Sequence, residues 1–182
     1  MDYLPIFLKV ENRPCLVVGG GKVAARKVAL LHRAGARITV VSPEKCNEVK
    51  TLVEQGAVTC IAREFRKDDM DGMVLVIAAT NDEAINRMVS ELANQHRIPV
   101  NVVDNPELCS FIMPSIIDRS PVQVAVSTGG NSPVLARLLR ARLESFIPAA
   151  YGRLARLVDE FRHSVKQRFS DAGQRLSLIH IS

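Results

Sequence analysis

The sequence is poor in aromatic residues and lacks metal-binding and disulfide spacings. Its 182 residues include no Trp, two Tyr and six Phe, so it offers little of the aromatic stacking that single-stranded nucleic acids need. The cysteines, at positions 15, 46, 60 and 109, form no C-x-x-C pair, and the four histidines are scattered. We therefore expect free thiols in a reducing cytoplasm, no metal site and no nucleic-acid partner.

Long apolar runs are also missing, and we do not expect the first residues to be a secretory signal. No stretch approaches the roughly 18 consecutive apolar residues of a membrane-spanning helix. The start, MDYLPIFLKVENR, has neither a basic region nor a small-residue cleavage site. We expect no membrane partner, and the length suits one medium-sized domain with at most a modest appendage.

The formal net charge of +5 belongs to the last part of the chain. Residues 132–182 contain 9 Lys and Arg against 4 Asp and Glu, whereas residues 1–131 contain 15 residues of each sign. A neutral first part followed by a basic helical part predicts an acidic partner for the second.

Two hydrophobic periodicities alternate along the first hundred residues. Short runs rich in Val, Ile and Leu predict strands buried on both faces, and apolar residues three and four positions apart predict helices. The expected strands are Cys15–Val18, Arg37–Val41, Ala57–Ala62, Met73–Ala79 and Pro99–Val103, and the expected helices are Val23–Ala34, Glu44–Gln55 and Asp82–His96. Ser42-Pro43-Glu44 and Thr80-Asn81-Asp82 supply capping side chains for two of these helices. The alternation predicts an α/β fold, a Rossmann-like parallel sheet with helices on both faces.

The pattern changes after Asp104. Val122–Ser127 predicts a strand, and Ser132 and Pro133 fit the first positions of a helix that runs to about Ser145. Ala149–Phe169 predicts a further helix. We expect domains over residues 1–113 and 114–147, followed by a helical region over 148–182.

A glycine turn joins the first expected strand to the first expected helix. Gly19, Gly21 and Ala24 match the G-x-G-x-x-G/A pattern of dinucleotide-binding units. In that pattern the first glycine permits a tight turn, the second lets the backbone approach a pyrophosphate, and the small third residue allows close helix packing. The alternative is a flexible glycine loop between two buried segments. The strand and helix on either side favour a cofactor site, with Gly19, Gly20, Gly21, Lys22 and Val23 as candidate contacts.

The acid that usually holds the adenine ribose is missing. An Asp or Glu is expected about 20 residues beyond the glycine turn, but the second strand ends in Val41-Ser42. Glu44 could reach back, or Ser42, Pro43 and backbone groups could serve instead. Although Lys45 is close, no arginine at the strand end calls for a 2′-phosphate, so the sequence favours NAD+ over NADP.

Asp104 and the Thr80-Asn81 pair follow two neighbouring expected strands, at the edge where an open parallel sheet binds ligands. A carboxylate there can accept a proton from a substrate, although position alone also permits a turn cap before Pro106. Thr80 and Asn81 either contact the nicotinamide-side ribose or only cap the next helix.

Three segments together resemble the N-terminal module of siroheme synthase: LPIFLKVENRPCLVVGGGKVAARK, VIAATND and NVVDNPELCSFIMPSIIDRSPVQVAVSTGGNSPVLARLLRARLE. The resemblance covers roughly residues 1–170 and implies a precorrin-2 dehydrogenase that is also a sirohydrochlorin ferrochelatase. It implies that NAD+ oxidises precorrin-2 to sirohydrochlorin and that Fe2+ is then inserted to give siroheme. Asp104 is implied as the general base that also helps the chelation, with Fe2+ as a substrate.

The resemblance also implies a structure and a binding partner for the second part of the chain. It implies a smaller α+β dimerisation domain, C-terminal helices and a homodimer, with polycarboxylate tetrapyrroles as the acidic partner. Candidate substrate contacts are Ser127, Thr128, Gly129, Asn131, Arg119 and Arg137, because turn amides, hydroxyls and guanidinium groups bind carboxylates. The alternative for Arg137, Arg140 and Arg142 is a solvated helix face or a subunit interface. Residues 153–165 fit an amphipathic helix with one buried face.

Two other functions stay open: a precorrin-2 dehydrogenase without chelatase activity, and a non-catalytic NAD-sensing module. Asp104 distinguishes the second of these from an enzyme, because a sensor needs no base. The ending LSLIHIS departs from the family, and we interpret residues 176–182 as a truncation or a non-native tail.

Overall fold

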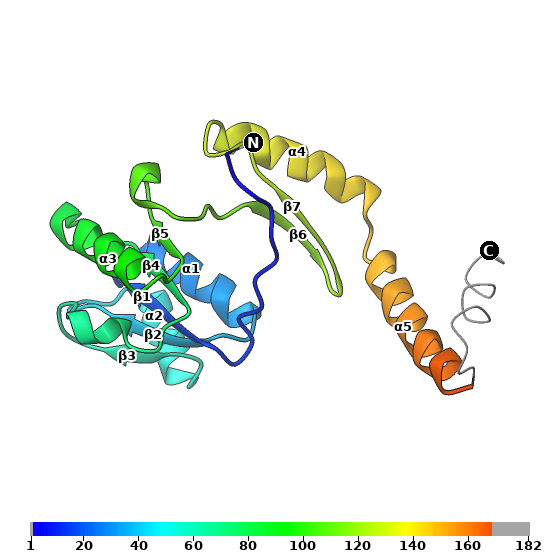
Figure 1. Ribbon diagram of the computed structural model, residues 1–182, viewed down its shortest axis with the longest axis horizontal. Coiled ribbons are helices and arrows are strands. Elements are labelled where there is room, and N and C mark those ends of the chain that lie inside the picture. The colour runs from blue at the N-terminus through cyan, green and yellow to red at the C-terminus, as the bar shows by residue number, and fades with distance from the viewer. Residues whose placement is uncertain (1, 169–182) are drawn as a thin grey trace. The chain divides into compact units, whose positions relative to one another are not determined.

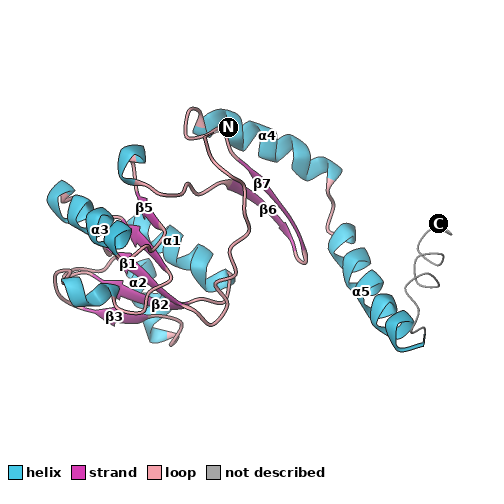
Figure 2. Ribbon diagram, viewed as in Figure 1, coloured by secondary structure: helices cyan, strands magenta, loops and turns pink. Residues whose placement is uncertain are grey.

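The chain folds into two compact units, Met1–Met113 and Pro114–Ser182 (Figures 1 and 2). The computed structural model describes residues 2–168, so the interpretation of residues 176–182 lies outside the described part. The separate domain expected over residues 114–147 stays a prediction.

Five parallel strands form the sheet of the first unit. Across the sheet they lie in the order β3 (Thr59–Ile61), β2 (Arg37–Val41), β1 (Pro14–Val18), β4 (Leu75–Ala78) and β5 (Val100–Val102). The chain builds outward from β1 in one direction through β2 and β3, then returns to the other side of β1 for β4 and β5. Ligands of open α/β sheets bind beside such a reversal, at the carboxyl ends of the strands.

Helices cover both faces of this sheet, as predicted. Successive strand residues point to opposite faces, so Cys15 and Val17 pack in one core while Leu16 and Val18 pack in the other. The first core is closed by α1 (Lys22–Arg33) and α2 (Asn47–Glu54), and the second by α3 (Glu83–Gln95) and the 3-10 turn η1 (Lys67–Met70). The Rossmann-like fold class is therefore confirmed.

One expected helix start is wrong. The helix expected from Glu44 begins at Asn47 instead, and its N-cap residue, Cys46, makes no side-chain cap. The Ser42 hydroxyl donates to Glu44 O at 2.7 Å, and the amide of Cys46 donates to Gly20 O at 2.8 Å. Because these bonds hold residues 42–46 against the glycine turn, the segment cannot join the helix. The start of α3 is as predicted, since Asp82 accepts hydrogen bonds from two amides of its first turn.

The second unit has a two-stranded antiparallel ribbon and two helices. Its elements are β6 (Ser115–Arg119), β7 (Val122–Val126), α4 (Pro133–Phe146) and α5 (Ala150–Arg168). Sequence analysis did not predict β6, because prolines bracket it on both sides. The start of α4 is as predicted, with Ser132 as N-cap and Pro133 in the first turn.

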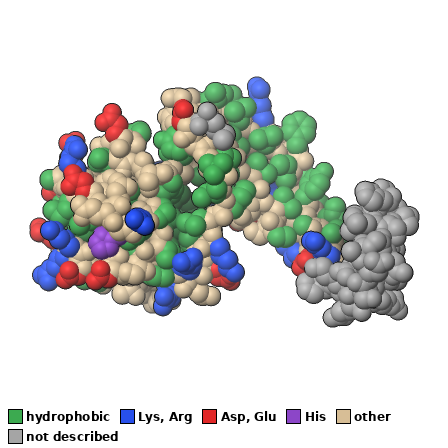
Figure 3. Space-filling model, viewed as in Figure 1, with side chains coloured by type: hydrophobic (Ala, Val, Ile, Leu, Met, Phe, Trp, Pro, Cys, Tyr) green, Lys and Arg blue, Asp and Glu red, His purple; other side chains and the backbone are tan. Residues whose placement is uncertain are grey.

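Large apolar side chains stay exposed on α4 and α5 (Figure 3). They are Val134, Leu135, Leu138, Leu139, Leu143, Phe146, Tyr151, Leu154, Leu157, Val158 and Phe161. Within the part of the chain that is described, no helix has the length and apolar character needed to cross a membrane.

Candidate functional site

A hollow of about 590 Å³ opens at the carboxyl ends of β1, β2 and β4. It gathers most of the predicted cofactor contacts, which are Gly19, Gly20, Gly21, Ser42, Pro43, Glu44, Thr80 and Asn81. Lys45, Cys46, Glu64, Phe65, Ala79, Asp82 and Ile85 also line it and were not predicted. The predicted residues Lys22, Val23 and Asp104 do not line this hollow.

The three glycines of the turn have different surroundings. Gly19 has a φ of +117°, and a Cβ on it would lie 2.4 Å from the backbone oxygen of Ala79. A Cβ on Gly20 would lie 2.0 Å from the backbone oxygen of Glu44. A Cβ on Gly21 meets no described atom within 4 Å. Neighbouring backbone therefore occupies the positions that a side chain at residue 19 or 20 would take, whereas the position beside Gly21 is open and lies next to the hollow.

The start of α1 is suited to an anion. The first helical hydrogen bond runs from the amide of Ala25 to Gly21 O, so the amides of Lys22 and Val23 have no partner within the helix. The first turn contains no acidic residue, and no side chain caps it. Free amides and the positive end of the helix dipole fit a pyrophosphate at this point.

The loop after β2 places one acidic side chain, that of Glu44, at the hollow. Ser42 is buried and its hydroxyl donates to Glu44 O, so this hydroxyl proton is already used. Glu44 is exposed and lines the hollow. Among the alternatives for the ribose, the geometry favours the Glu44 carboxylate over the Ser42 side chain.

The loop after β3 adds Glu64 and Phe65 to the wall of the hollow. Arg63 fixes this loop by donating two hydrogen bonds, of 2.8 and 2.7 Å, to the carboxylate of Asp69. The Arg63 guanidinium holds the pKa of Asp69 below its usual range. Sequence analysis missed this wall because no local pattern connects it with the glycine turn.

The loop after β4 is held by a buried amide on α3. The Asn86 side chain donates to Thr80 O at 3.0 Å and accepts from the Thr80 hydroxyl at 2.9 Å. The Thr80 side chain is therefore used inside the loop, while Asn81 is exposed at the hollow. Asn86 is a supporting residue that sequence analysis did not identify.

Asp104 lies at the same edge of the sheet, just beyond β5. Ala78 of β4 pairs with Val102 of β5, so Thr80 and Asp104 each stand two residues past a paired position. Asp104 is exposed and adopts a left-handed conformation with a φ of 58°. Burial above all lowers the pKa of Lys27 on α1, while the charge of Asp104 raises it, so this lysine stands near the carboxylate.

The predicted tetrapyrrole contacts belong to the second unit. Ser127, Thr128, Gly129 and Asn131 share the turn between β7 and α4. The Thr128 hydroxyl is used in that turn, donating to Ser132 O at 3.0 Å and accepting from its amide at 3.1 Å.

The two predicted arginines lie elsewhere in this unit. Arg119 pairs with Val122 at the far end of the β6–β7 ribbon, because the strands are antiparallel. Its guanidinium donates to Glu144 and to Ile147 O, each at 3.1 Å. Arg137 donates to Pro133 O in its own helix at 3.3 Å. The unit therefore does not bring Arg119 to the 127–131 turn.

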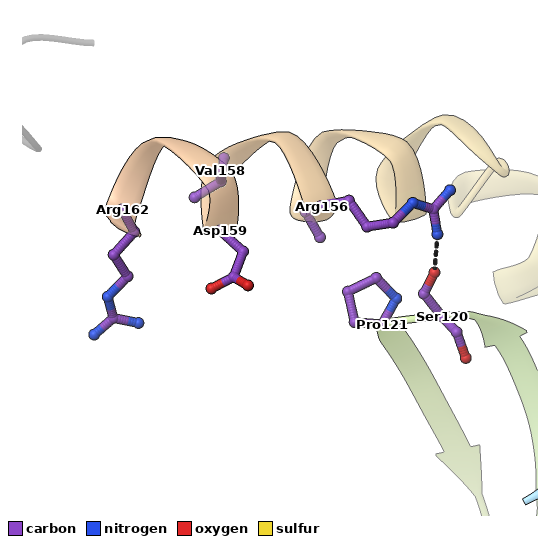
Figure 4. A pocket seen from close by; sticks show the side chains of 7 residues that line it. Ser120, Pro121, Arg156, Val158, Asp159 and Arg162 are labelled. Atoms are coloured by element: carbon purple, nitrogen blue, oxygen red, sulfur yellow. Dashed lines mark hydrogen bonds between the residues drawn. The ribbon is translucent and has the colours of Figure 1, made fainter. Parts of the chain in front are cut away.

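A second, shallow hollow of about 670 Å³ lies between the β6–β7 turn and α5 (Figure 4). Arg156 reaches across it and donates to Ser120 O at 2.6 Å. None of the predicted site residues lines this hollow. Within the described residues, His, Cys, Asp and Glu side chains form no group of three or more that could hold a metal ion.

Comparison with known proteins identifies three families along the chain. The family described as putative NAD(P)-binding matches residues 6–115, the sirohaem biosynthesis protein central family matches residues 119–145, and the sirohaem synthase dimerisation region matches residues 150–177. The chain is 62% identical to the siroheme synthase of Thioalkalivibrio sulfidiphilus over 175 residues and 58% identical to that of Methylobacillus flagellatus. These matches cover 96% of this chain but only 36% and 38% of the relatives.

Among solved structures, the chain is similar to SirC, a precorrin-2 dehydrogenase. The two share 26% sequence identity with a TM-score of 0.76, and the match covers 95% of this chain and 85% of SirC. The similarity therefore extends beyond the glycine turn that many nucleotide-binding proteins share.

Proposed function

The chain belongs to the siroheme synthase family, and on that premise we propose that it oxidises precorrin-2 to sirohydrochlorin with NAD+ and then inserts Fe2+. The observation that carries the proposal is the position of Asp104, just beyond the strand next to β4 and at the edge of the sheet where the glycine turn forms its hollow. The similarity to SirC, whose name states a precorrin-2 dehydrogenase, supports the oxidation in particular.

The cofactor we propose is NAD+, which supplies a hydride acceptor when bound. The residues present fit it, because Gly21 leaves open space and the first-turn amides of Lys22 and Val23 can receive the pyrophosphate. We assign the adenine ribose hydroxyls to Glu44, whose carboxylate accepts hydrogen bonds from a diol and repels a 2′-phosphate. Thr80 and Asn81 are proposed at the nicotinamide end, with Asn86 holding their loop.

Asp104 is the proposed proton acceptor in both reactions. Oxidation removes a hydride and a proton from precorrin-2, and the proton passes to the carboxylate of Asp104. Insertion of Fe2+ releases two pyrrole N–H protons, which the same exposed carboxylate can receive one after the other, passing the first to water before it accepts the second. A left-handed backbone is uncommon for a residue with a side chain, and such conformations are concentrated at functional sites.

The second unit is proposed to form a homodimer and to bind the tetrapyrrole carboxylates. The match to a dimerisation region and the exposed apolar side chains of α4 and α5 support the dimer. Ser127, Gly129 and Asn131 are exposed in their turn and stay our preferred carboxylate contacts, together with Thr128. Arg137 and Arg119 stay candidates, although Arg119 is already bound to Glu144. We place the reaction in the cytoplasm, where the four free cysteines would stay reduced.

The test compares Asp104→Asn with Glu107→Gln. Asparagine tolerates the left-handed conformation as well as aspartate does, so the fold is preserved. Glu107 is an exposed acid three positions further on and serves as a matched loss of charge. We expect Asp104→Asn to lower NADH formation from precorrin-2 by about 100-fold or more, with NAD+ affinity within about twofold of wild type. Glu107→Gln should behave as wild type.

Three outcomes separate the alternatives. Normal turnover by Asp104→Asn would show that another group is the base. If the wild-type chain binds NAD+ but makes no NADH from precorrin-2, it is a sensing module rather than an enzyme. If it makes NADH but gives no change in the Soret region when Fe2+ or Co2+ is added to sirohydrochlorin, it is a dehydrogenase without chelatase activity.

A further inference from the structure

The outer edge of β5 is closed by two side chains rather than by another strand. β5 is the last strand of the sheet, so its amides on one side have no strand partner. The amide of Val100 donates to the Ser110 hydroxyl at 2.8 Å, and the amide of Val102 donates to the Cys109 sulfur at 3.1 Å. We call Cys109 and Ser110 the edge clasp. They satisfy the edge amides and protect the edge from pairing with another chain.

Cys109 also closes the turn that carries Asp104. Its thiol lies 3.2 Å from Val102 O and 3.3 Å from Asn105 O, within hydrogen-bonding distance of both as a donor. Val102 precedes Asp104 by two residues and Asn105 follows it by one. One sulfur atom therefore binds the chain on both sides of the proposed base.

The thiol is in the right protonation state for this role. Burial raises the pKa of Cys109, although the Val102 amide and Lys27 oppose the shift. The sulfur therefore keeps its proton near neutral pH and can donate to a carbonyl oxygen while it accepts from the Val102 amide. A thiolate could accept from the amide but could not donate to the carbonyls.

Asp104 needs such a constraint. A left-handed conformation is disfavoured for residues with a side chain, and although Asp visits it more readily than most, a free turn would also populate other conformations. The turn also has one long backbone bond, from the Asn105 amide to Val102 O at 3.4 Å. The other anchors lie further along the chain, where Ser90 on α3 donates to Leu108 O at 2.7 Å and Ser110 holds Val100, and these two bonds do not reach the residues beside Asp104.

We propose that Cys109 is a positioning residue that holds Asp104 in its left-handed conformation and so sets the direction of its carboxylate. The effect that we expect on kcat rests on the proposed role of Asp104 as the base. The effect that we expect on the backbone conformation of Asp104 does not rest on that role, because it concerns only the turn between Val102 and Cys109.

The experiment uses the full chain with Cys109→Ala, the conservative variant Cys109→Ser and the matched control Ser110→Ala. Ser110→Ala removes the other bond of the edge clasp without touching the turn of Asp104. Three quantities are measured for each: amide exchange at Val100 and Val102, the HN–Hα coupling of Asp104, and steady-state NADH formation from precorrin-2.

We expect Cys109→Ala to speed exchange at Val102 by at least about tenfold and to change the Asp104 coupling from its left-handed value. The kcat should fall by about 10- to 100-fold, as for a misplaced catalytic group, while KM for NAD+ stays within about twofold. Cys109→Ser should restore kcat to within about threefold, because a hydroxyl donates and accepts as a thiol does. Ser110→Ala should speed exchange at Val100 and leave kcat unchanged.

Unchanged exchange and coupling in Cys109→Ala would overturn the proposal, as would an equal loss of kcat in Ser110→Ala. Altered coupling with normal kcat would show that the turn does not position the base. If the wild-type chain makes no NADH, the proposed function fails, and the coupling of Asp104 alone then decides whether Cys109 holds the turn.

Discussion

Alanine at Gly20 and alanine at Gly21 should damage the protein in opposite ways, although the residues are adjacent. A methyl group on Gly20 would lie 2.0 Å from the backbone oxygen of Glu44 and 2.9 Å from the Ser42 hydroxyl oxygen. A carbonyl oxygen cannot rotate away as a flexible side chain can, so residues 42–46 must move. The hydrogen bond from the Cys46 amide to Gly20 O resists that movement.

The expected cost follows from this geometry. Overpacking of a close-packed site costs about 1 to 3 kcal/mol, and a backbone obstacle places Gly20→Ala near the upper end. For a chain of this size, about 3 kcal/mol lowers Tm by about 6 to 12 °C. Gly21→Ala meets no described atom within 4 Å and loses only N-cap preference, about 1 kcal/mol or less.

Gly21→Ala should weaken the affinity for NAD+ although it has little effect on stability. A methyl group there occupies the space through which a pyrophosphate approaches the first-turn amides. Loss of one hydrogen bond to a charged group is worth about 2 kcal/mol, which corresponds to about a 30-fold weaker affinity for NAD+. Gly21→Ala should therefore stay folded and bind poorly.

Circular dichroism and titration calorimetry suit these measurements, because the chain contains no Trp for fluorescence. Thermal unfolding followed by circular dichroism gives the Tm of each variant, and calorimetry gives the dissociation constant for NAD+ below the unfolding range. The reasoning would be refuted if Gly20→Ala were as stable as Gly21→Ala. Normal NAD+ affinity in Gly21→Ala would refute the placement of the pyrophosphate.

Two further predictions concern a buried thiol and the ribose acid. Burial raises the pKa of Cys15 from 9.0 to about 11. The unfolded chain then loses this proton first, so stability should fall by about 2 to 3 kcal/mol between about pH 9 and pH 11. Urea unfolding should show a weaker fall in Cys15→Ala, and an equal fall in both proteins would contradict the assignment. Glu44→Gln should reduce the preference for NAD+ over NADP by about tenfold. Glu48→Gln, on the first turn of α2, is the control, and equal ratios in both variants would exclude Glu44 as the ribose acid.

Local sequence was enough for the sheet because its strands are buried on both faces. Runs such as Cys15–Val18 contain only apolar residues, which pack in two cores at once, and no other arrangement of a short strand buries them so completely. The expected start of α2 failed for a different reason. Ser42-Pro43-Glu44 has the composition of a helix cap, but its atoms bind each other and the glycine turn.

The candidate site, too, could be predicted from the sequence only in part. Sequence spacing located the glycine turn, the loop after β4 and Asp104, because parallel strands bring their carboxyl ends to one edge. It could not find Phe65, Asn86 or Cys109, whose roles depend on contacts that form only when the chain folds and that no sequence pattern encodes. The sequence also could not distinguish the roles of the three glycines, since these differ only because Ala79 packs against Gly19 and Glu44 packs against Gly20.

The sequence by itself determined the order of strands and helices in the first unit, the glycine turn and the family resemblance, because periodicity and short motifs act over a few neighbouring residues. The tertiary structure alone decided which groups are free to act. Hydrogen bonds within their own loops occupy the side chains of Ser42 and Thr128, and a bond to Asn86 on α3 occupies that of Thr80. The carboxylates of Glu44 and Asp104 stay exposed. A partly buried thiol on the sheet edge, which no local pattern reveals, lies within hydrogen-bonding distance of the chain on both sides of Asp104.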